Sequence, residues 1–292
     1  MKKYSLHSLL CMLLALLIVC SPVLSSAAET AVVRYPQLFN EDDPQSEYIL
    51  AILNLGLRLS GKKYQLAATD LKMQQARVIQ EMLSEHGEAD LLWTMTSAER
   101  EAQLLAIKIP IDKGLIGWRI SLVKAERSSI FHGVRTVRDL QAFKAGQEHD
   151  WPDTPILQSN GLPVVTATAY DALFNMLTGK RFDYFPRSVM EIGDELRVHP
   201  EHNLEIEQEI VLHYPAALYF FVSPRRPELA RDLRVGLEKA VADGSFEKLF
   251  RKYQLPMVKS ANLGKRRVLE LKNPLLGPNS LPEKRPELWY RP

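Results

Sequence analysis

The stretch Asp90-Leu-Leu-Trp-Thr-Met-Thr-Ser-Ala-Glu-Arg100 is the most informative feature of this chain. In it an apolar run ends in hydroxyl-bearing, turn-forming residues, and an arginine follows about one helical turn later. This order suits a loop at the carboxyl end of a strand, where backbone N–H groups and a guanidinium can converge on a carboxylate. By itself this motif is weak evidence for a ligand-binding loop. The segments before and after it support that interpretation.

The first 28 residues have the composition of a secretory signal peptide. Two lysines open the segment, an uncharged apolar run follows, and Ser26-x-Ala28 offers a small-residue cleavage site. The run is too short to span a bilayer comfortably as a permanent helix. A lipid anchor on Cys20 is the alternative, but Val19 is bulkier than a lipobox normally takes. The segment therefore predicts export and cleavage after Ala28.

Composition excludes several classes of function. Removing 28 of the 292 residues leaves 264, enough for two lobes or one large domain. Both cysteines, Cys11 and Cys20, lie in the leader, so the mature chain would have no disulfide, catalytic thiolate or cysteine metal site. The leader holds two of the 37 basic residues and none of the 35 acidic ones, so the mature chain is close to neutral. This balance does not predict binding to nucleic acid or to an anionic membrane.

Motifs for catalysis, cofactors and metals are weak or missing. The sequence has no Gly-rich phosphate loop, no Gly-x-Ser-x-Gly and no His-Glu-x-x-His, so no cofactor or catalytic constellation is expected. In His199-Pro-Glu-His202 two histidines flank an acid, which could indicate a metal site. The proline between them and the lack of a further ligand favour a polar loop instead.

Strand-like and helix-like segments alternate from Ala31 onward, which predicts parallel sheets with right-handed crossovers. Two long β-prone runs, 114–123 and 216–223, separate a second alternating set from the first, and the segment after Pro256 reads as irregular. The expected strands are 31–35, 64–69, 89–93, 143–147, 164–168, 182–185 and 204–212, and the expected helices start at or near 46, 74, 154, 169, 188, 227 and 245.

Three segments carry a resemblance to a known family. Residues 90–100 are similar to its strand plus Thr-Pro-Glu-Arg loop, and Thr178-Gly-Lys-Arg-Phe-Asp183 is similar to its Gly-Lys-x-Asp segment with one extra residue. Residues 239–253 are similar to its C-terminal helix pair and are the most specific of the three. Over residues 31–253 the chain resembles a divergent type II periplasmic solute-binding protein of family 3, the amino-acid-binding group.

The resemblance implies an α/β fold of two lobes, each a mostly parallel sheet flanked by helices. Two hinge crossovers would join the lobes, and the two long β-prone runs fall where these belong. The implied organisation is a signal peptide over 1–28, lobe one over 29–120 plus 217–255, lobe two over 121–216, and a C-terminal tail over 256–292 packed on the body.

The resemblance also places a ligand site. The family's carboxylate-binding arginine carries over to Arg100, and its helix-start threonine to Thr154 or Asp153. Arg187-Ser188 stands where the family has an aspartate for the ligand ammonium group, with Glu191 the next acid, which argues against an α-amino acid. Met95 and Trp93 replace small residues, and Ser97-Ala98 replaces Thr-Pro, which would reshape the pocket. The expected ligand-binding residues are Tyr35, Trp93, Thr94, Thr96, Ser97, Arg100, His149, Trp151, Asp153, Thr154, Arg187 and Ser188.

Each of these residues also has a plainer interpretation. Arg100 could pair on a helix surface with Glu99 or Glu101, and Tyr35 and Trp93 could be ordinary core aromatics. The loop His149-Asp150-Trp151 suits an anionic ligand group before a helix, or it is a solvated loop. Arg187 could complement a second acidic group on the ligand or be a surface cation.

The resemblance implies a non-enzymatic periplasmic protein, acting as a monomer, that binds a small anionic solute, an amino acid or a related carboxylate. Hinge closure would deliver the solute to an inner-membrane ABC permease or signal to a sensor receptor. One alternative is a periplasmic lyase or dehydratase similar to cyclohexadienyl dehydratases, with Asp150, Asp153 or Glu191 as acid or base. Another is a scaffold that no longer binds ligand.

Overall fold

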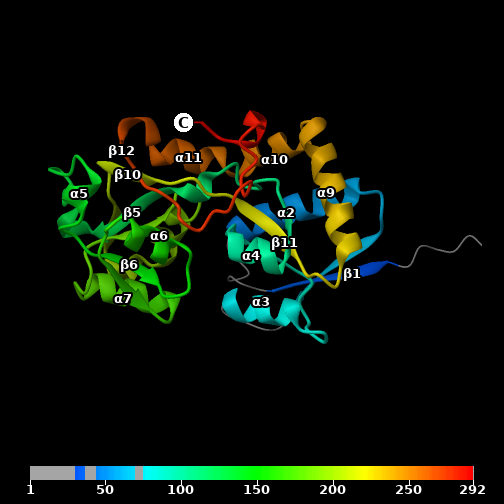
Figure 1. Cartoon of the computed structure of the whole chain (residues 1–292). Coiled ribbons are helices and arrows are strands. Elements are labelled where there is room, and N and C mark those ends of the chain that lie inside the picture. The colour runs from blue at the N-terminus through cyan, green and yellow to red at the C-terminus, as the bar shows by residue number, and fades with distance from the viewer. Residues whose placement is uncertain (1–29, 37–43, 70–74, 292) are drawn as a thin grey trace, which may run out of the picture.

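The computed structural model describes residues 30–36, 44–69 and 75–291, arranged as two bodies joined along their upper part in the view of Figure 1. The predicted leader, residues 1–28, lies outside the described residues, as does residue 74, where a helix was expected to start. Among the described residues no helix is long and apolar enough to cross a membrane.

The first lobe contains β1 (Ala31–Pro36) and β2 (Tyr64–Thr69), which run parallel. Beside β1 lies β3 (Leu91–Met95), because the N–H of Asp90 donates to the carbonyl of Arg34 at 2.9 Å. The late strand β11 (Leu218–Val222) returns to this lobe and pairs antiparallel with β3 and with β4 (Leu105–Ile107). The helices of this lobe are α2 (Pro44–Leu59), α3 (Gln75–Leu83), α4 (Ala98–Gln103), α9 (Pro227–Ala242) and α10 (Ser245–Tyr253).

Helices α2 and α9 approach each other closely at two glycines. A Cβ atom on Gly236 would lie 1.7 Å from the carbonyl oxygen of Gly56, and one on Gly56 would lie 2.8 Å from the Leu233 side chain. The two backbones can touch only because both positions lack a side chain. This contact fixes the late helix α9 on the early helix α2.

The second lobe is built around β5 (Trp118–Lys124). It pairs antiparallel with β8 (Phe185–Ser188), β9 (Leu204–Ile206) and β10 (Ile210–His213), and β12 (Arg267–Glu270) adds parallel to β10. The parallel pair β6 (Ala145–Glu148) and β7 (Val164–Ala167) joins β8 through a bridge between Ala145 and Tyr184. The helices are α5 (Val137–Leu140), α6 (Asp153–Ser159), α7 (Tyr170–Thr178), α8 (Ile192–Val198) and α11 (Leu255–Ala261).

The structure corrects several expected elements. The strand expected over 182–185 lies at 185–188, and the helix expected from Ser188 starts at Ile192. The strand expected over 204–212 is two strands, because the Glu207 carboxylate accepts the N–H groups of Glu209 and Ile210 and forms a turn between them. In the second lobe the pairs β6–β7 and β10–β12 run parallel, as expected, whereas β5 pairs antiparallel with β8, β9 and β10.

Two connections run between the lobes, and one carboxylate ties them together. Buried Asp112 accepts the N–H groups of Gly114 at 3.1 Å and Ile116 at 2.6 Å on the first connection. It also accepts the N–H of Leu218 at 3.3 Å on the second. A single side chain therefore holds both connections in register.

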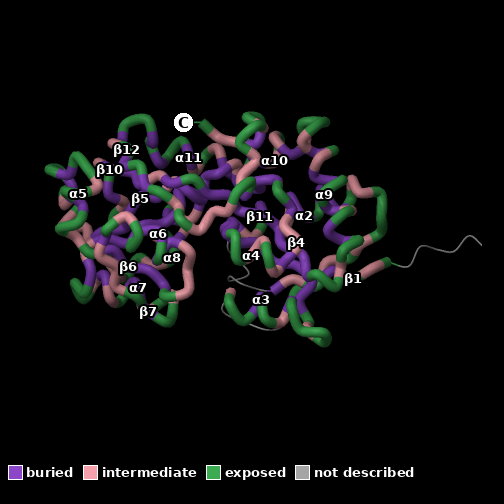
Figure 2. Tube along the Cα trace, in the orientation of Figure 1, coloured by how far each residue is buried: buried purple, intermediate pink, exposed green. Residues whose placement is uncertain are grey.

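The segment after Pro256, expected to be irregular, contains α11 and β12. From β12 on the second lobe the chain returns to the first, where Leu275 accepts the N–H of Ala98 at 2.8 Å and Arg285 pairs with Glu238 at 2.6 Å. Figure 1 shows this segment in red across the junction of the two bodies, and Figure 2 shows buried residues continuing through that junction.

Candidate functional site

Arg100 lies at the end of β3, on the first turn of α4. Ser97 begins this helix and accepts the N–H of Arg100 at 3.2 Å through its hydroxyl. The guanidinium folds back over the strand end, where Nη1 donates to Thr94 Oγ1 at 2.9 Å and to the Met95 carbonyl at 2.7 Å. Nη2 donates to Gln75 Oε1 at 3.3 Å. Neutral oxygens of its own lobe thus hold the arginine in place.

The Arg100 charge has no carboxylate partner within ion-pair distance among the described residues. Burial lowers the pKa of Arg100 below its usual range, and the charges of Asp150, Glu99 and Asp153 oppose that shift. Two of these acids, Asp150 and Asp153, belong to the second lobe. A cation from one lobe therefore faces carboxylates from the other.

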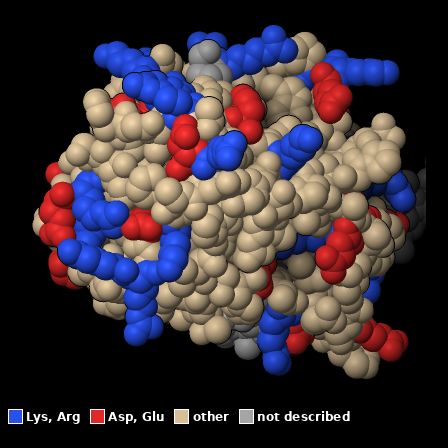
Figure 3. Space-filling view, turned by 60° about the vertical axis from the view of Figure 1, so that its left-hand side comes forward, with Lys and Arg blue, Asp and Glu red and all other residues tan. Residues whose placement is uncertain are grey.

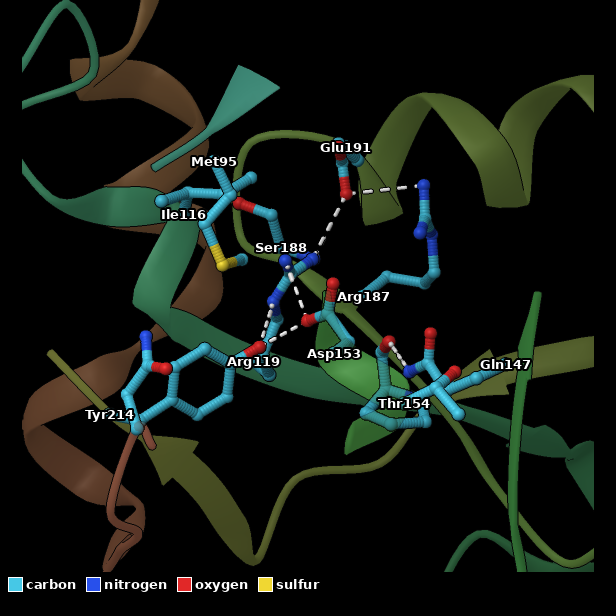
Figure 4. A network of polar contacts seen from close by, with 12 residues as sticks. Met95, Ile116, Arg119, Gln147, Asp153, Thr154, Arg187, Ser188, Glu191 and Tyr214 are labelled. Atoms are coloured by element: carbon cyan, nitrogen blue, oxygen red, sulfur yellow. Dashed lines mark hydrogen bonds and ion pairs between the residues drawn. The ribbon is translucent and has the colours of Figure 1, made fainter. Parts of the chain in front are cut away.

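The facing side of the second lobe is a buried network centred on Arg119 of β5 (Figure 4). Arg119 pairs with Asp153 at 2.7 Å and with Glu191 at 3.3 Å, and its Nε donates to the Tyr214 hydroxyl at 2.9 Å. The Tyr214 hydroxyl in turn donates to Asp153. Burial alone would lower the pKa of Arg119, but the charges of Asp153, Tyr214 and Glu191 raise it above its usual range.

Arg187 extends this network through the end of β8. It pairs with Glu191 at 3.1 Å and with Glu195 at 2.5 Å, and its guanidinium carbon lies 4.4 Å from the centre of the Trp151 ring. Arg187 is buried, so the idea of a surface cation is wrong. Two carboxylates already pair with its charge, so Arg187 would attract a second acidic group on a ligand only weakly.

Two arginines and three carboxylates meet in this network, so its formal charge is negative by one. Burial would raise the pKa of Glu191, but Arg187 and Arg119 hold it below its usual range, so the carboxylate stays ionised. A permanently ionised, ion-paired acid is a poor proton donor. Asp153 pairs with Arg119 and accepts a hydrogen bond from the Tyr214 hydroxyl.

The structure brings some of the expected site residues together and places others apart. Trp151, Arg187, Ser188 and Asp153 join the network, and Ser188 donates its N–H to Glu191 at 3.2 Å. Thr154 donates its hydroxyl to the Glu148 carbonyl at 2.8 Å.

Tyr35 and Trp93 pack on each other with ring centres 5.9 Å apart, and Trp93 is only 4% exposed within the hydrophobic core. Thr96 binds Glu101 at 2.7 Å through its hydroxyl, and His149 is exposed beside the Ala167 carbonyl. A ligand-binding role for these four residues stays a prediction.

Sequence reasoning missed Arg119, Tyr214, Glu195 and Gln75. The signal for Arg119 was present, since it is a lone charge inside the apolar run Gly114-Leu-Ile-Gly-Trp-Arg-Ile-Ser-Leu-Val123. A charge buried in a strand requires a partner. Nothing local identifies that partner, because Tyr214 lies 95 residues away in the chain.

A separate groove of about 950 Å³ lies at the amino ends of β1 and β2, where Thr30, Tyr64, Arg58 and Lys248 contribute to its walls. Ligands of α/β sheets bind at the carboxyl ends of strands. Arg100 lies at such an end, after the last residue of β3. Figure 3 shows basic and acidic side chains interspersed around the visible face, with a broad area between them that carries neither.

Comparison with known proteins identifies the fold. No family model and no curated protein matches the chain. An ancestral arginine-binding protein solved with arginine is similar with a TM-score of 0.57 and 16% identity, over 77% of this chain and 98% of its own. A periplasmic binding protein of Salmonella typhimurium with high arginine specificity has a TM-score of 0.56 and 16% identity, over 77% and 99%. The VFT2 domain of BvgS from Bordetella pertussis has a TM-score of 0.58 and 16% identity, over 87% and 100%.

The chain thus has the two-lobed fold of type II periplasmic binding proteins, and the expectation from its sequence is confirmed at that level. The first two of the similar structures named above are binding proteins.

Proposed function

We propose that this protein binds a small solute between its lobes and that Arg100 receives a carboxylate of the solute. The observation that supports this is the guanidinium held at the end of β3 by Thr94, Gln75 and the Met95 carbonyl. Among the described residues these bonds use Nη1 and one N–H of Nη2. The Nε–H and the second N–H of Nη2 remain for a planar, two-oxygen acceptor.

The second lobe favours a cationic group at the other end of the solute. Its network has an excess of one negative charge, and Asp150 adds another nearby acid. A solute with both groups would satisfy each lobe with an opposite charge. We therefore propose an amino acid or a related zwitterion, in agreement with the arginine and glutamine bound by the similar ancestral protein. A dianion is disfavoured, because Arg187 already pairs with Glu191 and Glu195.

We propose that the leader is cleaved after Ala28 and that the mature monomer acts in the periplasm. Solute would bind first to the Arg100 lobe, and closure would bring the second lobe over it. The closed form would be read by a membrane partner, an ABC permease or a sensor receptor. This role requires no chemical step, in agreement with the ion-paired state of Asp153 and Glu191.

The test is native mass spectrometry of the mature protein, purified from its own periplasm, with thermal-shift screening of amino acids, dicarboxylates and peptides. We expect a bound or stabilising zwitterion whose effect disappears in Arg100→Met. Arg251→Ala is the matched control, because Arg251 is an exposed arginine paired with Glu247 on α10. A protein that carries no solute and shows no shift across the screen, or equal binding by Arg100→Met, would contradict the proposal.

A further inference from the structure

Three side chains that could bind a metal ion, those of His199, Glu201 and His202, lie close together in the second lobe. They belong to the 3-10 turn Pro200–His202 and to the residue before it. Glu201 Oε1 lies 3.5 Å from His199 Nδ1 and 3.3 Å from His202 Nε2, and the three ligand atoms all fall within 4.8 Å of one another. Pro200 starts the turn, and Asn203, with φ of 49°, ends it in the left-handed conformation. The proline that argued against a metal site in the sequence thus begins the turn that gathers the ligands.

The spacing of these atoms suits a small divalent cation. Nitrogen and carboxylate oxygen ligands bind Zn²⁺ at about 2.0–2.2 Å, so neighbouring ligands of a tetrahedral site lie roughly 3.4 Å apart. The separations of Glu201 from His199 and from His202, 3.5 and 3.3 Å, match that edge, and the two histidine nitrogens lie within 4.8 Å of each other.

Hydrogen bonding determines which nitrogen of His202 carries a proton. The Thr178 hydroxyl donates its one proton to the Phe174 carbonyl at 2.9 Å. It therefore accepts from His202 Nδ1, which lies 3.2 Å away. In a neutral imidazole this leaves Nε2 with a lone pair that faces the Glu201 carboxylate. Two acceptors facing each other repel unless a proton or a metal cation lies between them.

The histidine rings are held in place before any ion arrives. His199 stacks on Phe174 with ring centres 3.8 Å apart, and its side chain is 18% exposed. The His202 side chain is 13% exposed, whereas that of Glu201 is 60% exposed and opens the group to solvent. Thr178 acts as the outer partner that orients a ligating imidazole.

We propose that His199, Glu201 and His202 bind a divalent transition cation of the zinc class, with solvent completing its coordination. Two imidazoles and one carboxylate suit Zn²⁺, Cu²⁺ or Ni²⁺ better than Mg²⁺ or Ca²⁺, which prefer oxygen ligands. The inference does not depend on the proposed solute or on Arg100.

The test is calorimetric titration of untagged mature protein with ZnCl₂, alongside histidine ring NMR. We expect one Zn²⁺ per chain, shifted ring signals of His199 and His202, and no competition from Mg²⁺. Glu201→Gln, at a side chain that is 60% exposed, and His202→Gln should each weaken binding by about tenfold or more.

His213→Gln is the matched control, because His213 pairs with Glu270 at 2.8 Å on the same lobe and has no third ligand among the described residues. Its Zn²⁺ affinity should equal that of the wild type. Unchanged binding in both Glu201→Gln and His202→Gln, or loss in His213→Gln, would overturn the proposal. The proposal would also fail if Zn²⁺ did not shift the ring signals and NMR showed a proton on His202 Nε2, facing the Glu201 carboxylate.

Discussion

Arg100 and Arg119 show how the same residue type serves two purposes in this protein. Arg100 is held by neutral oxygens and keeps an uncompensated charge, whereas Arg119 is 3% exposed and surrounded by Asp153, Glu191 and Tyr214. Unpaired charge is available to a ligand, while paired charge in the interior serves the structure.

We predict that Arg119→Met destabilises the protein by about 3–5 kcal/mol, because it leaves Asp153 and Glu191 buried with a missing partner. Urea unfolding measures this loss. The exposed pair of Arg251 and Glu247 supplies the comparison, and Arg251→Ala should cost less than about 1 kcal/mol. Equal losses in the two variants would show that the buried network contributes no more than a surface pair.

The place of Arg100 could be predicted from the sequence, because strand, cap and arginine are consecutive in the chain. The network around Arg119 could not, since its members come from β5, α6, β8 and residue 214. Residues brought together by tertiary packing leave no local pattern, which is why Trp151 and Arg187 were expected to contact ligand instead of each other.

At the scale of elements, α2 and α9 depend on their glycine contact. We predict that Gly236→Ala costs about 3 kcal/mol or more, because its Cβ would lie 1.7 Å from the Gly56 carbonyl oxygen and the helices must separate. In Gly193→Ala, in α8, the new Cβ meets no atom within 4 Å, so stability should stay the same or rise by up to about 1 kcal/mol. Thermal unfolding of both variants measures this, and similar melting temperatures would contradict the packing argument.

Asp112, which joins the two connections, makes stability depend on pH. Burial raises its pKa from 3.8 to about 6, although the N–H groups of Ile116, Gly114 and Leu218 act in the opposite direction. The folded state therefore binds the proton more tightly than the unfolded state, and this group's contribution falls as pH rises from about 4 to 6, by roughly 3 kcal/mol.

Asp112→Asn removes that titration. The difference in unfolding free energy between wild type and variant should therefore shift against the wild type as pH rises through this window, as measured by urea unfolding from pH 4 to 7. If the unfolding free energies of the two proteins changed with pH by the same amount, Asp112 would not titrate as described.

Most helices and strands could be predicted from hydrophobic periodicity and helix caps. The strands that were predicted wrongly or missed depend on contacts that leave no periodic pattern in the sequence. The turn at Glu207 splits an expected strand because a buried carboxylate binds two backbone N–H groups. Strand β12 was unexpected because β10, its ladder partner among the described residues, lies more than fifty residues earlier. Pairing over such separations leaves no periodic signal in either segment.

At the scale of the molecule, the C-terminal segment forms a third link between the lobes. It pairs with β10 on the second lobe and bonds to Ala98, Tyr219 and Glu238 on the first. Any closure over a solute must occur with this segment attached, and its contact at Ala98 lies two residues from Arg100.

The proposed function depends most on the binding of a solute carboxylate by Arg100. The most direct measurement is calorimetric binding of the solute that native mass spectrometry identifies, and of its methyl ester, to wild type and to Arg100→Met. We predict that esterification weakens binding to the wild type by roughly tenfold to 150-fold, the equivalent of about 1.5–3 kcal/mol for a hydrogen-bonded charge. In Arg100→Met the acid should already bind weakly, and esterification should change little. If esterification weakened binding by the same factor in the wild type and in Arg100→Met, the carboxylate would bind elsewhere.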